Sequence, residues 1–83
     1  MYYVYVLQNE KKEFYTGYSA NLEKRLFEHN AGMNASTKEH QWELVYYEMY
    51  TNEKYARKRE QSLKKNRRMK TLLLKRVEES LNI

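Results

Sequence analysis

The sequence has no cysteine, no proline and only two glycines among its 83 residues. Without cysteine there is no disulfide framework, no thiolate zinc site and no cysteine nucleophile, so a reducing cytoplasm is the expected compartment. The longest apolar runs, residues 2–7 and 72–74, are far shorter than the roughly 18–20 residues that cross a bilayer. The N-terminal residues also lack the basic flank and small-residue cleavage site of a secretory signal. We therefore expect a cytoplasmic protein that does not insert into membranes.

The length leaves room for one domain, residues 1–83, because a chain this short buries enough surface for one small core. The mean hydropathy is −1.08 and 33% of the residues are charged, a composition that leans toward disorder. Nine tyrosines, two phenylalanines and a tryptophan supply the apolar surface that opposes this tendency. The composition predicts one folded domain and excludes a two-domain enzyme.

Charge is distributed unevenly along the chain. Residues 1–53 contain five Lys and Arg against eight Glu, and residues 54–83 contain eleven against three, so the net charges are −3 and +8. A basic surface of this kind attracts polyanions, above all nucleic acid, through phosphate contacts and counterion release. A solvated, lysine-rich helix would give the same counts. Charge alone leaves both interpretations open.

The hydrophobic pattern predicts the order strand, strand, helix, strand, helix, helix. Residues 2–7, 14–18 and 42–50 are rich in aromatic and β-branched residues, and the polar residues 8–13 join the first two as a hairpin. Ser19 or Asn21 can cap a helix of about ten residues, and Thr51 or Asn52 can cap a second one. A third helix is expected from about residue 68 to residue 81, and residues 33–41 are expected to form a loop. The fold class predicted is α+β, a three-stranded antiparallel sheet flanked by helices.

Side-chain periodicity predicts which residues face the core. Strand alternation puts Tyr3, Tyr5 and Leu7 on one face of the sheet and Tyr2, Val4 and Val6 on the other. The apolar stripe expected on the third helix consists of Leu73, Leu74, Val77 and Leu81.

Two of the helices place polar side chains among apolar ones. Arg25 and His29 share a helix face with Leu22 and Leu26, so they are expected at the edge of the core. They fit either a boundary role, in which the arginine stem covers apolar surface, or a functional site. Glu60 is the only acid between residues 54 and 76. It fits either an internal salt bridge, with Arg25 as one partner, or a Mg²⁺ site, because Mg²⁺ accepts one or two protein carboxylates.

Several short motifs, taken in order, resemble those of the GIY-YIG nuclease domain. They are Tyr3-Val4-Tyr5, Tyr15-Thr16-Gly17, the segment Asn21-Leu22-Glu23-Lys24-Arg25-Leu26 with His29, Asn30 and Gly32, and later Ala56 with Glu60. The resemblance covers about residues 2–76 and is closest to the small stand-alone members related to the nuclease half of an excinuclease. Tyr3 stands in place of the family's glycine and Thr16 in place of its isoleucine, and we interpret both changes as structural.

The resemblance implies a three-stranded antiparallel sheet with flanking helices, and hydrolysis of a DNA phosphodiester with Mg²⁺ or Mn²⁺. By position, the matching catalytic residues are Tyr5, Tyr15, Arg25 and His29, the metal ligand is Glu60, and the motif glycine is Gly17. Arginine suits the phosphate geometry, and one of the two tyrosines would activate water. The sequence does not decide which tyrosine this is. Asn66 is the nearest candidate for an asparagine that follows the glutamate in several relatives, and we do not assign it.

The basic helices are expected to contact DNA phosphates without reading bases. The residues expected to do so are Lys64, Lys65, Arg67, Arg68 and Lys70. RNA would satisfy the same contacts. The predicted function is an endonuclease directed by DNA structure or damage, or targeted by a partner protein, because so small a domain leaves little surface for reading sequence. The alternatives are a nucleic-acid-binding module that kept the fold without cleaving, and an interaction domain that binds an acidic protein.

Overall fold

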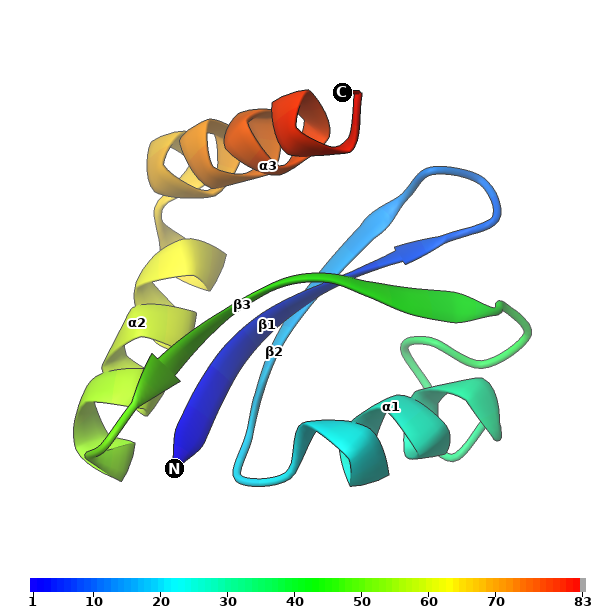
Figure 1. Cartoon of the computed structure of the whole chain (residues 1–83), viewed down its shortest axis with the longest axis horizontal. Helices are drawn as coiled ribbons and strands as arrows, with labels where there is room; N and C mark the ends of the chain where they lie inside the picture. The colour runs from blue at the N-terminus through cyan, green and yellow to red at the C-terminus, as the bar shows by residue number, and fades with distance from the viewer. Residues whose placement is uncertain (83) are drawn as a thin grey trace.

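The computed structural model describes residues 1–82, which form a three-stranded sheet with helices on both faces (Figure 1). The elements in chain order are β1 (Tyr2–Asn9), β2 (Phe14–Ser19), α1 (Leu22–Asn30), β3 (Trp42–Tyr50), α2 (Glu53–Lys65) and α3 (Arg67–Leu81). This order and the α+β class confirm the prediction from the sequence, with boundaries shifted by two residues or fewer. In the described part of the chain, no helix is both long and apolar enough to cross a membrane.

The central strand of the sheet is β1, which pairs antiparallel with β2 on one side and with β3 on the other. Tyr5 faces Gly17 of β2 and Tyr47 of β3 in this register. The turn between β1 and β2 is closed by Asn9, whose side-chain oxygen accepts hydrogen bonds from the backbone N–H groups of Lys11 and Glu13 at 3.0 Å each. An asparagine that bonds to the backbone after it is typical of tight turns.

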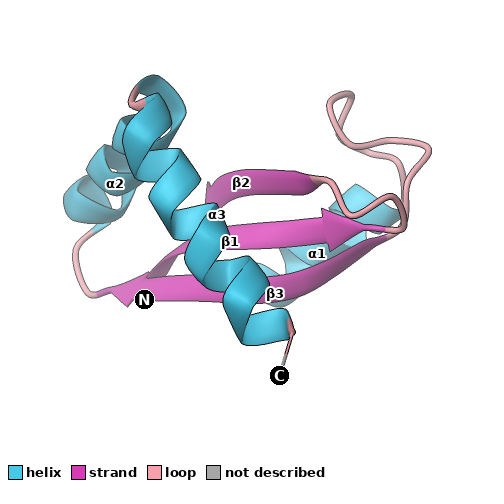
Figure 2. Cartoon of the chain, turned by 90° about the horizontal axis from the view of Figure 1, so that it is seen from above, coloured by secondary structure: helices cyan, strands magenta, loops and turns pink. Residues whose placement is uncertain are grey.

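The two faces of the sheet carry separate cores, as the alternation along β1 predicts. Val4 and Val6 pack with Ala56, Leu63, Leu73 and Val77 under α2 and α3. Tyr5, Leu7 and Trp42 pack on the opposite face, where Leu22 and Leu26 of α1 cover them. Figure 2 shows α3 crossing one face of the strands with α1 behind the other. Leu81, expected in the α3 stripe, is 45% exposed because the helix end extends beyond this core.

Each helix begins at an asparagine whose side chain accepts a backbone hydrogen bond. Asn21 accepts from Lys24 at 3.1 Å, Asn52 from Lys54 at 2.9 Å and Asn66 from Met69 at 3.1 Å. Such N-caps are worth about 1 kcal/mol each. Asn66 both ends α2 and starts α3, so it forms the corner between the two basic helices.

Candidate active site

A hydrogen bond joins the central strand to the last turn of α1. The phenol oxygen of Tyr5 and Nε2 of His29 lie 2.9 Å apart. Tyr5 is 3% exposed and His29 is fully buried. The histidine expected at the edge of the core therefore lies within it, on the face that α1 covers. A buried imidazole needs a hydrogen-bond partner at each ring nitrogen, so these contacts both hold the ring in place and decide which nitrogen carries the proton.

Gly17 leaves room for the Tyr5 ring to lie against the neighbouring strand. A Cβ at this position would approach the hydroxyl and a ring carbon of Tyr5 to less than 3.0 Å. The positive φ angles of the described chain are at Lys12, Gly32 and Glu39, so Gly17 is required for space and not for an unusual backbone angle. The motif glycine thus leaves the space that the Tyr5 phenol occupies.

Tyr15 brings a second phenol to the same place from the edge strand β2. Its ring centroid is 5.0 Å from that of His29 and 6.1 Å from that of Trp42. Burial, and next the nearby Tyr15, raise the pKa of Tyr5 well above the usual value for a phenol, although Arg25 opposes the shift. Burial, and next Arg25, lower the pKa of His29. At neutral pH Tyr5 therefore keeps its proton and His29 is uncharged.

Arg25 lies half-buried beside this cluster, one turn of α1 before His29. Its Nε is 3.7 Å from Oε1 of Glu28, and the two side chains are 41% and 27% exposed. Both residues line a hollow of about 220 Å³ together with Ser19 and Asn21. Glu28 was not singled out by the sequence pattern. It restrains the arginine and raises the pKa of His29, opposite to the effect of Arg25.

Glu60 belongs to α2, but its carboxylate lies near the phenols of Tyr5 and Tyr15. Its carboxylate contributes to the raised pKa of Tyr5. Oε2 of Glu60 forms an ion pair with Nζ of Lys64 at 3.3 Å, and the same Nζ is 5.9 Å from the ring centroid of Tyr15. Arg25, one of the partners considered for Glu60, pairs with Glu28 instead. The cluster that we call the tyrosine site therefore consists of Tyr5, Tyr15, Arg25, His29 and Glu60.

The donor set at the tyrosine site is small. Within residues 1–82, no three His or Glu side chains gather to hold a metal ion by themselves. Glu60, with its side chain 21% exposed, offers a single carboxylate. That suits Mg²⁺ or Mn²⁺ only as an ion whose other ligands are waters and phosphate oxygens, which is the usual mode for Mg²⁺. The residues present fit such an ion, on the condition that the Lys64 ammonium leaves the carboxylate.

Thr37 completes the surroundings of His29, and the sequence pattern gave no indication of it. Its hydroxyl oxygen lies 2.6 Å from Nδ1 of His29, and both residues are fully buried. The indole N–H of Trp42 donates to the carbonyl oxygen of Thr37 at 2.8 Å. The polar loop at residues 33–41, expected to be a connection only, thus supplies a buried hydrogen-bonding residue.

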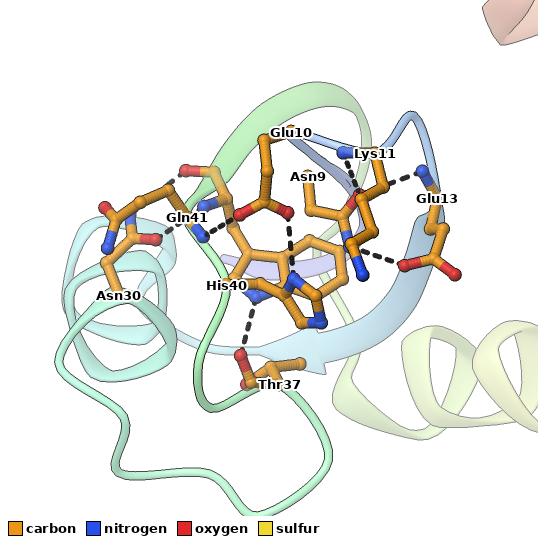
Figure 3. A network of polar contacts seen from close by, with 9 residues as sticks. Asn9, Glu10, Lys11, Glu13, Asn30, Thr37, His40 and Gln41 are labelled. Atoms are coloured by element: carbon orange, nitrogen blue, oxygen red, sulfur yellow. Dashed lines mark hydrogen bonds and ion pairs between the residues drawn. The ribbon is translucent and has the colours of Figure 1, made fainter.

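The loop at residues 31–41 is anchored at its end by two side chains (Figure 3). Asn30 accepts from the backbone N–H of Trp42 at 2.6 Å and donates to its carbonyl at 3.0 Å. Glu10, in the β1–β2 turn, accepts from the backbone N–H of Gln41 at 3.0 Å, and its other oxygen lies 2.8 Å from Nδ1 of His40. These contacts lower the pKa of Glu10 and tie the hairpin turn to the loop.

The five basic residues expected to contact phosphates are not all at the tyrosine site. Lys64 is, through its contacts with Glu60 and Tyr15. Lys65, Arg67 and Arg68 are exposed around the corner between α2 and α3, and Lys70 is half-buried in the first turns of α3. The structure therefore places one cation beside the phenols and the others farther along the helices.

Comparison with known proteins identifies the family of the chain. Residues 1–72 match the GIY-YIG catalytic domain. The chain is 40% identical over 76 residues to a UPF0213 protein of Clostridium perfringens, covering 89% of this chain and 82% of that protein. It is 39% identical over 75 residues to a UPF0213 protein of Staphylococcus saprophyticus, covering 88% and 92%. A UPF0213 protein of Staphylococcus haemolyticus is 39% identical over 80 residues, covering 94% and 95%. No solved structure matches the chain significantly.

Proposed function

Because this chain belongs to the GIY-YIG catalytic-domain family, we propose that it is an endonuclease that hydrolyses DNA phosphodiester bonds with Mg²⁺ or Mn²⁺. The observation that carries the proposal is the buried hydrogen bond between Tyr5 and His29, with Tyr15 against the imidazole and Arg25 and Glu60 close enough to change the pKa of Tyr5. Phenol and imidazole can activate water, guanidinium can stabilise charge on the phosphate, and carboxylate can hold a metal ion, which are three functions used in phosphodiester hydrolysis.

Tyr5 is the better placed of the two phenols to activate water, because it has a proton acceptor. In the proposed step, the water oxygen forms a bond to phosphorus while the bond between phosphorus and the leaving 3′ oxygen breaks. The water proton passes to the Tyr5 oxygen, the Tyr5 proton passes to Nε2 of His29, and the leaving oxygen takes a proton from solvent. Tyr5 is neutral before and after the step, which its raised pKa favours over a stable phenolate. His29 starts uncharged and finishes as an imidazolium. Tyr15 then confines the imidazole and the attacking water.

The charge that develops on the phosphate is met by cations. Arg25 offers a planar fork of N–H donors that matches two phosphate oxygens, and Glu28 restrains its position. Glu60 would hold the metal ion, which supplies a Lewis acid for the phosphate and the leaving oxygen when bound. Lys64, released from Glu60, is then free to bind a phosphate of the substrate.

Binding along the rest of the substrate is proposed to follow the helices. Lys65, Arg67, Arg68 and Lys70 would contact successive phosphates, which gives affinity without sequence specificity. The target would then be set by DNA structure or damage, or by a partner protein. RNA offers the same phosphates, so cleavage of matching DNA and RNA substrates separates the two.

The test is cleavage of duplex, nicked and branched DNA and of matching RNA by the purified protein, with and without Mg²⁺ or Mn²⁺. We expect metal-dependent cleavage of DNA that Glu60→Gln abolishes. Glu53→Gln is the matched control, since Glu53 is on the same helix but bonds to Tyr18 and Arg57. Cleavage that survives Glu60→Gln would refute the metal site. Binding of every substrate without cleavage would support the alternative, a nucleic-acid-binding module with this fold.

Salt dependence tests the contacts along the helices. If all five basic residues neutralise phosphates, DNA affinity should fall by about 500-fold between 50 and 200 mM salt. An affinity that hardly changes with salt would contradict the phosphate contacts and favour an acidic protein as the partner.

A further inference from the structure

The imidazole of His29 is enclosed by two hydroxyl groups, one at each ring nitrogen. Nε2 faces the phenol of Tyr5 at 2.9 Å, and Nδ1 faces the hydroxyl of Thr37 at 2.6 Å. His29 and Thr37 are fully buried, so water does not compete for either contact. Because burial and Arg25 keep the ring uncharged, it carries one proton, and that proton is on one nitrogen or the other.

The two positions of the proton give different chemistry. With the proton on Nδ1, the ring donates to Thr37 and accepts the phenol proton of Tyr5 at Nε2. With the proton on Nε2, the ring donates to the Tyr5 oxygen, and Thr37 must donate to Nδ1. Only the first arrangement leaves Nε2 able to receive a proton from Tyr5. Which nitrogen carries the proton is set by the hydrogen bond that the other one makes.

The chemistry of the partners favours the proton on Nδ1. A phenol is intrinsically a more acidic donor than an aliphatic hydroxyl, and an aliphatic hydroxyl oxygen is the better acceptor of the two. The best donor therefore meets the basic ring nitrogen, and the ring N–H meets the threonine oxygen. The threonine proton has its own acceptor, the carbonyl oxygen of Asn34 at 3.4 Å.

Thr37 is held in place independently of His29. Its backbone N–H donates to the Asn34 carbonyl at 3.1 Å, and its carbonyl accepts from the indole of Trp42 at 2.8 Å. Asn30 fixes the backbone of Trp42 in turn. The fold of the loop therefore places the Thr37 hydroxyl against Nδ1 of His29.

We propose that Thr37 is a positioning residue that holds His29 in its Nδ1-protonated form, so that Nε2 accepts the proton of Tyr5. The assignment of the tautomer rests on the two hydrogen bonds of the ring and on the chemistry of its partners, and its consequence for catalysis rests on the proposed endonuclease function. Thr37 does not reach the substrate and acts through His29.

The experiment is long-range ¹H–¹⁵N NMR of the ¹⁵N-labelled protein at pH 7, which reports the protonated nitrogen of each histidine ring. His40→Gln identifies the signals of His29 by elimination. We expect wild type and Thr37→Ser to show the Nδ1-protonated form, and Thr37→Val, which keeps the shape but loses the hydroxyl, to shift toward the Nε2-protonated form. Thr16→Val is the matched control, a buried threonine whose register partner is Val6, and it should leave the His29 signals unchanged.

The wild-type spectrum decides the assignment even if Thr37→Val does not fold. An Nε2-protonated His29 in wild type, or an unchanged tautomer in a folded Thr37→Val protein, would overturn the proposal. Where cleavage is measured, Thr37→Val should lower kcat by about 100-fold and leave KM nearly unchanged, with recovery in Thr37→Ser. An Nδ1-protonated His29 in a protein that cleaves nothing would uphold the role of Thr37 and refute the endonuclease function.

Discussion

Replacement of Gly17 by alanine should destabilise the wild-type protein, but it should not destabilise a protein in which Tyr5 is changed to leucine. In the wild-type protein the added methyl would lie under 3.0 Å from the hydroxyl and a ring carbon of Tyr5. The ring is 3% exposed and bonded to His29, so it cannot move without losing that bond. Overpacking costs about 1–3 kcal/mol and the lost hydrogen bond about 1 kcal/mol. Gly17→Ala should therefore destabilise the wild-type protein by about 2–4 kcal/mol.

The same substitution should be neutral or stabilising in the Tyr5→Leu background. The shorter side chain removes the clash, and Gly17 does not have a positive φ that alanine would avoid. Alanine in place of glycine within a strand then contributes about 0.5–1 kcal/mol, because less backbone freedom is lost on folding. The coupling energy of the double-mutant cycle is expected to be about 2–5 kcal/mol.

Urea unfolding of the four proteins, followed by the fluorescence of Trp42, measures this coupling. Gly32→Ala is the control, because Gly32 has a φ of +76° and an added methyl there would make only an ordinary contact, with Cβ of Lys38 at 3.9 Å. It should cost about 1–2 kcal/mol in both backgrounds, since its cost comes from the backbone angle. An equal cost of Gly17→Ala with Tyr5 and with Leu would refute the steric reasoning.

Three further predictions concern charges outside this contact. Glu48 accepts hydrogen bonds from Tyr46 and Tyr50 at 2.8 Å each and from Arg59 at 2.9 Å. Glu48→Ala should therefore lower the free energy of unfolding in urea by about 2 kcal/mol. Glu53→Ala, which removes an exposed ion pair, should lower it by less. The pKa of His29 is lower in the folded protein than its ordinary 6.5, so the unfolded chain binds the extra proton first. Stability should fall as the pH drops below about 6.5, by up to about 1.4 kcal/mol per pH unit, and His29→Gln should remove this slope between pH 7.5 and 5.5. Lys64→Met should raise the Mn²⁺ affinity, measured by water proton relaxation, several-fold, because the ammonium no longer competes for Glu60. Lys65→Met should leave this affinity unchanged. A weaker affinity in Lys64→Met would contradict the competition between the ammonium and the metal ion.

The sequence predicted the elements well because their signals are local. Alternation along β1 assigned Val4 and Val6 to one core and Tyr5 and Leu7 to the other, as observed. Helix starts were predicted within two residues, since an asparagine cap acts on the residues directly after it. The resemblance to the GIY-YIG family identified Gly17 as a motif residue but did not explain why a glycine is needed there. The explanation is the Tyr5 ring that lies against it, and this contact depends on the pairing of β1 with β2, which the periodicity of a single strand does not contain.

The parts of the site that the sequence missed depend on contacts across loops and between helix neighbours. Thr37 is in a polar segment without periodicity, and its pairing with His29 follows from how the loop folds back over α1. The partner of Glu60 was open because several cations are within reach in sequence, and an i,i+4 contact with Lys64 formed in preference to one with Arg25 on another helix. An ion pair within one helix needs no tertiary alignment, which gives it the smaller entropic cost.

The tyrosine site shares Tyr5 and Tyr15 with the core on the α1 face of the sheet. Tyr5 is a member of that core with Leu7 and Trp42, and His29 and Thr37 are fully buried beside it. A chain of 83 residues has too little interior to bury a separate polar network, so the groups that would move protons also hold α1 and the loop onto the sheet. Substitution of Tyr5, His29 or Thr37 must therefore be judged by unfolding free energy as well as by cleavage. Arg25 and Glu60, whose side chains are 41% and 21% exposed, are the positions where a loss of activity can be separated from a loss of fold.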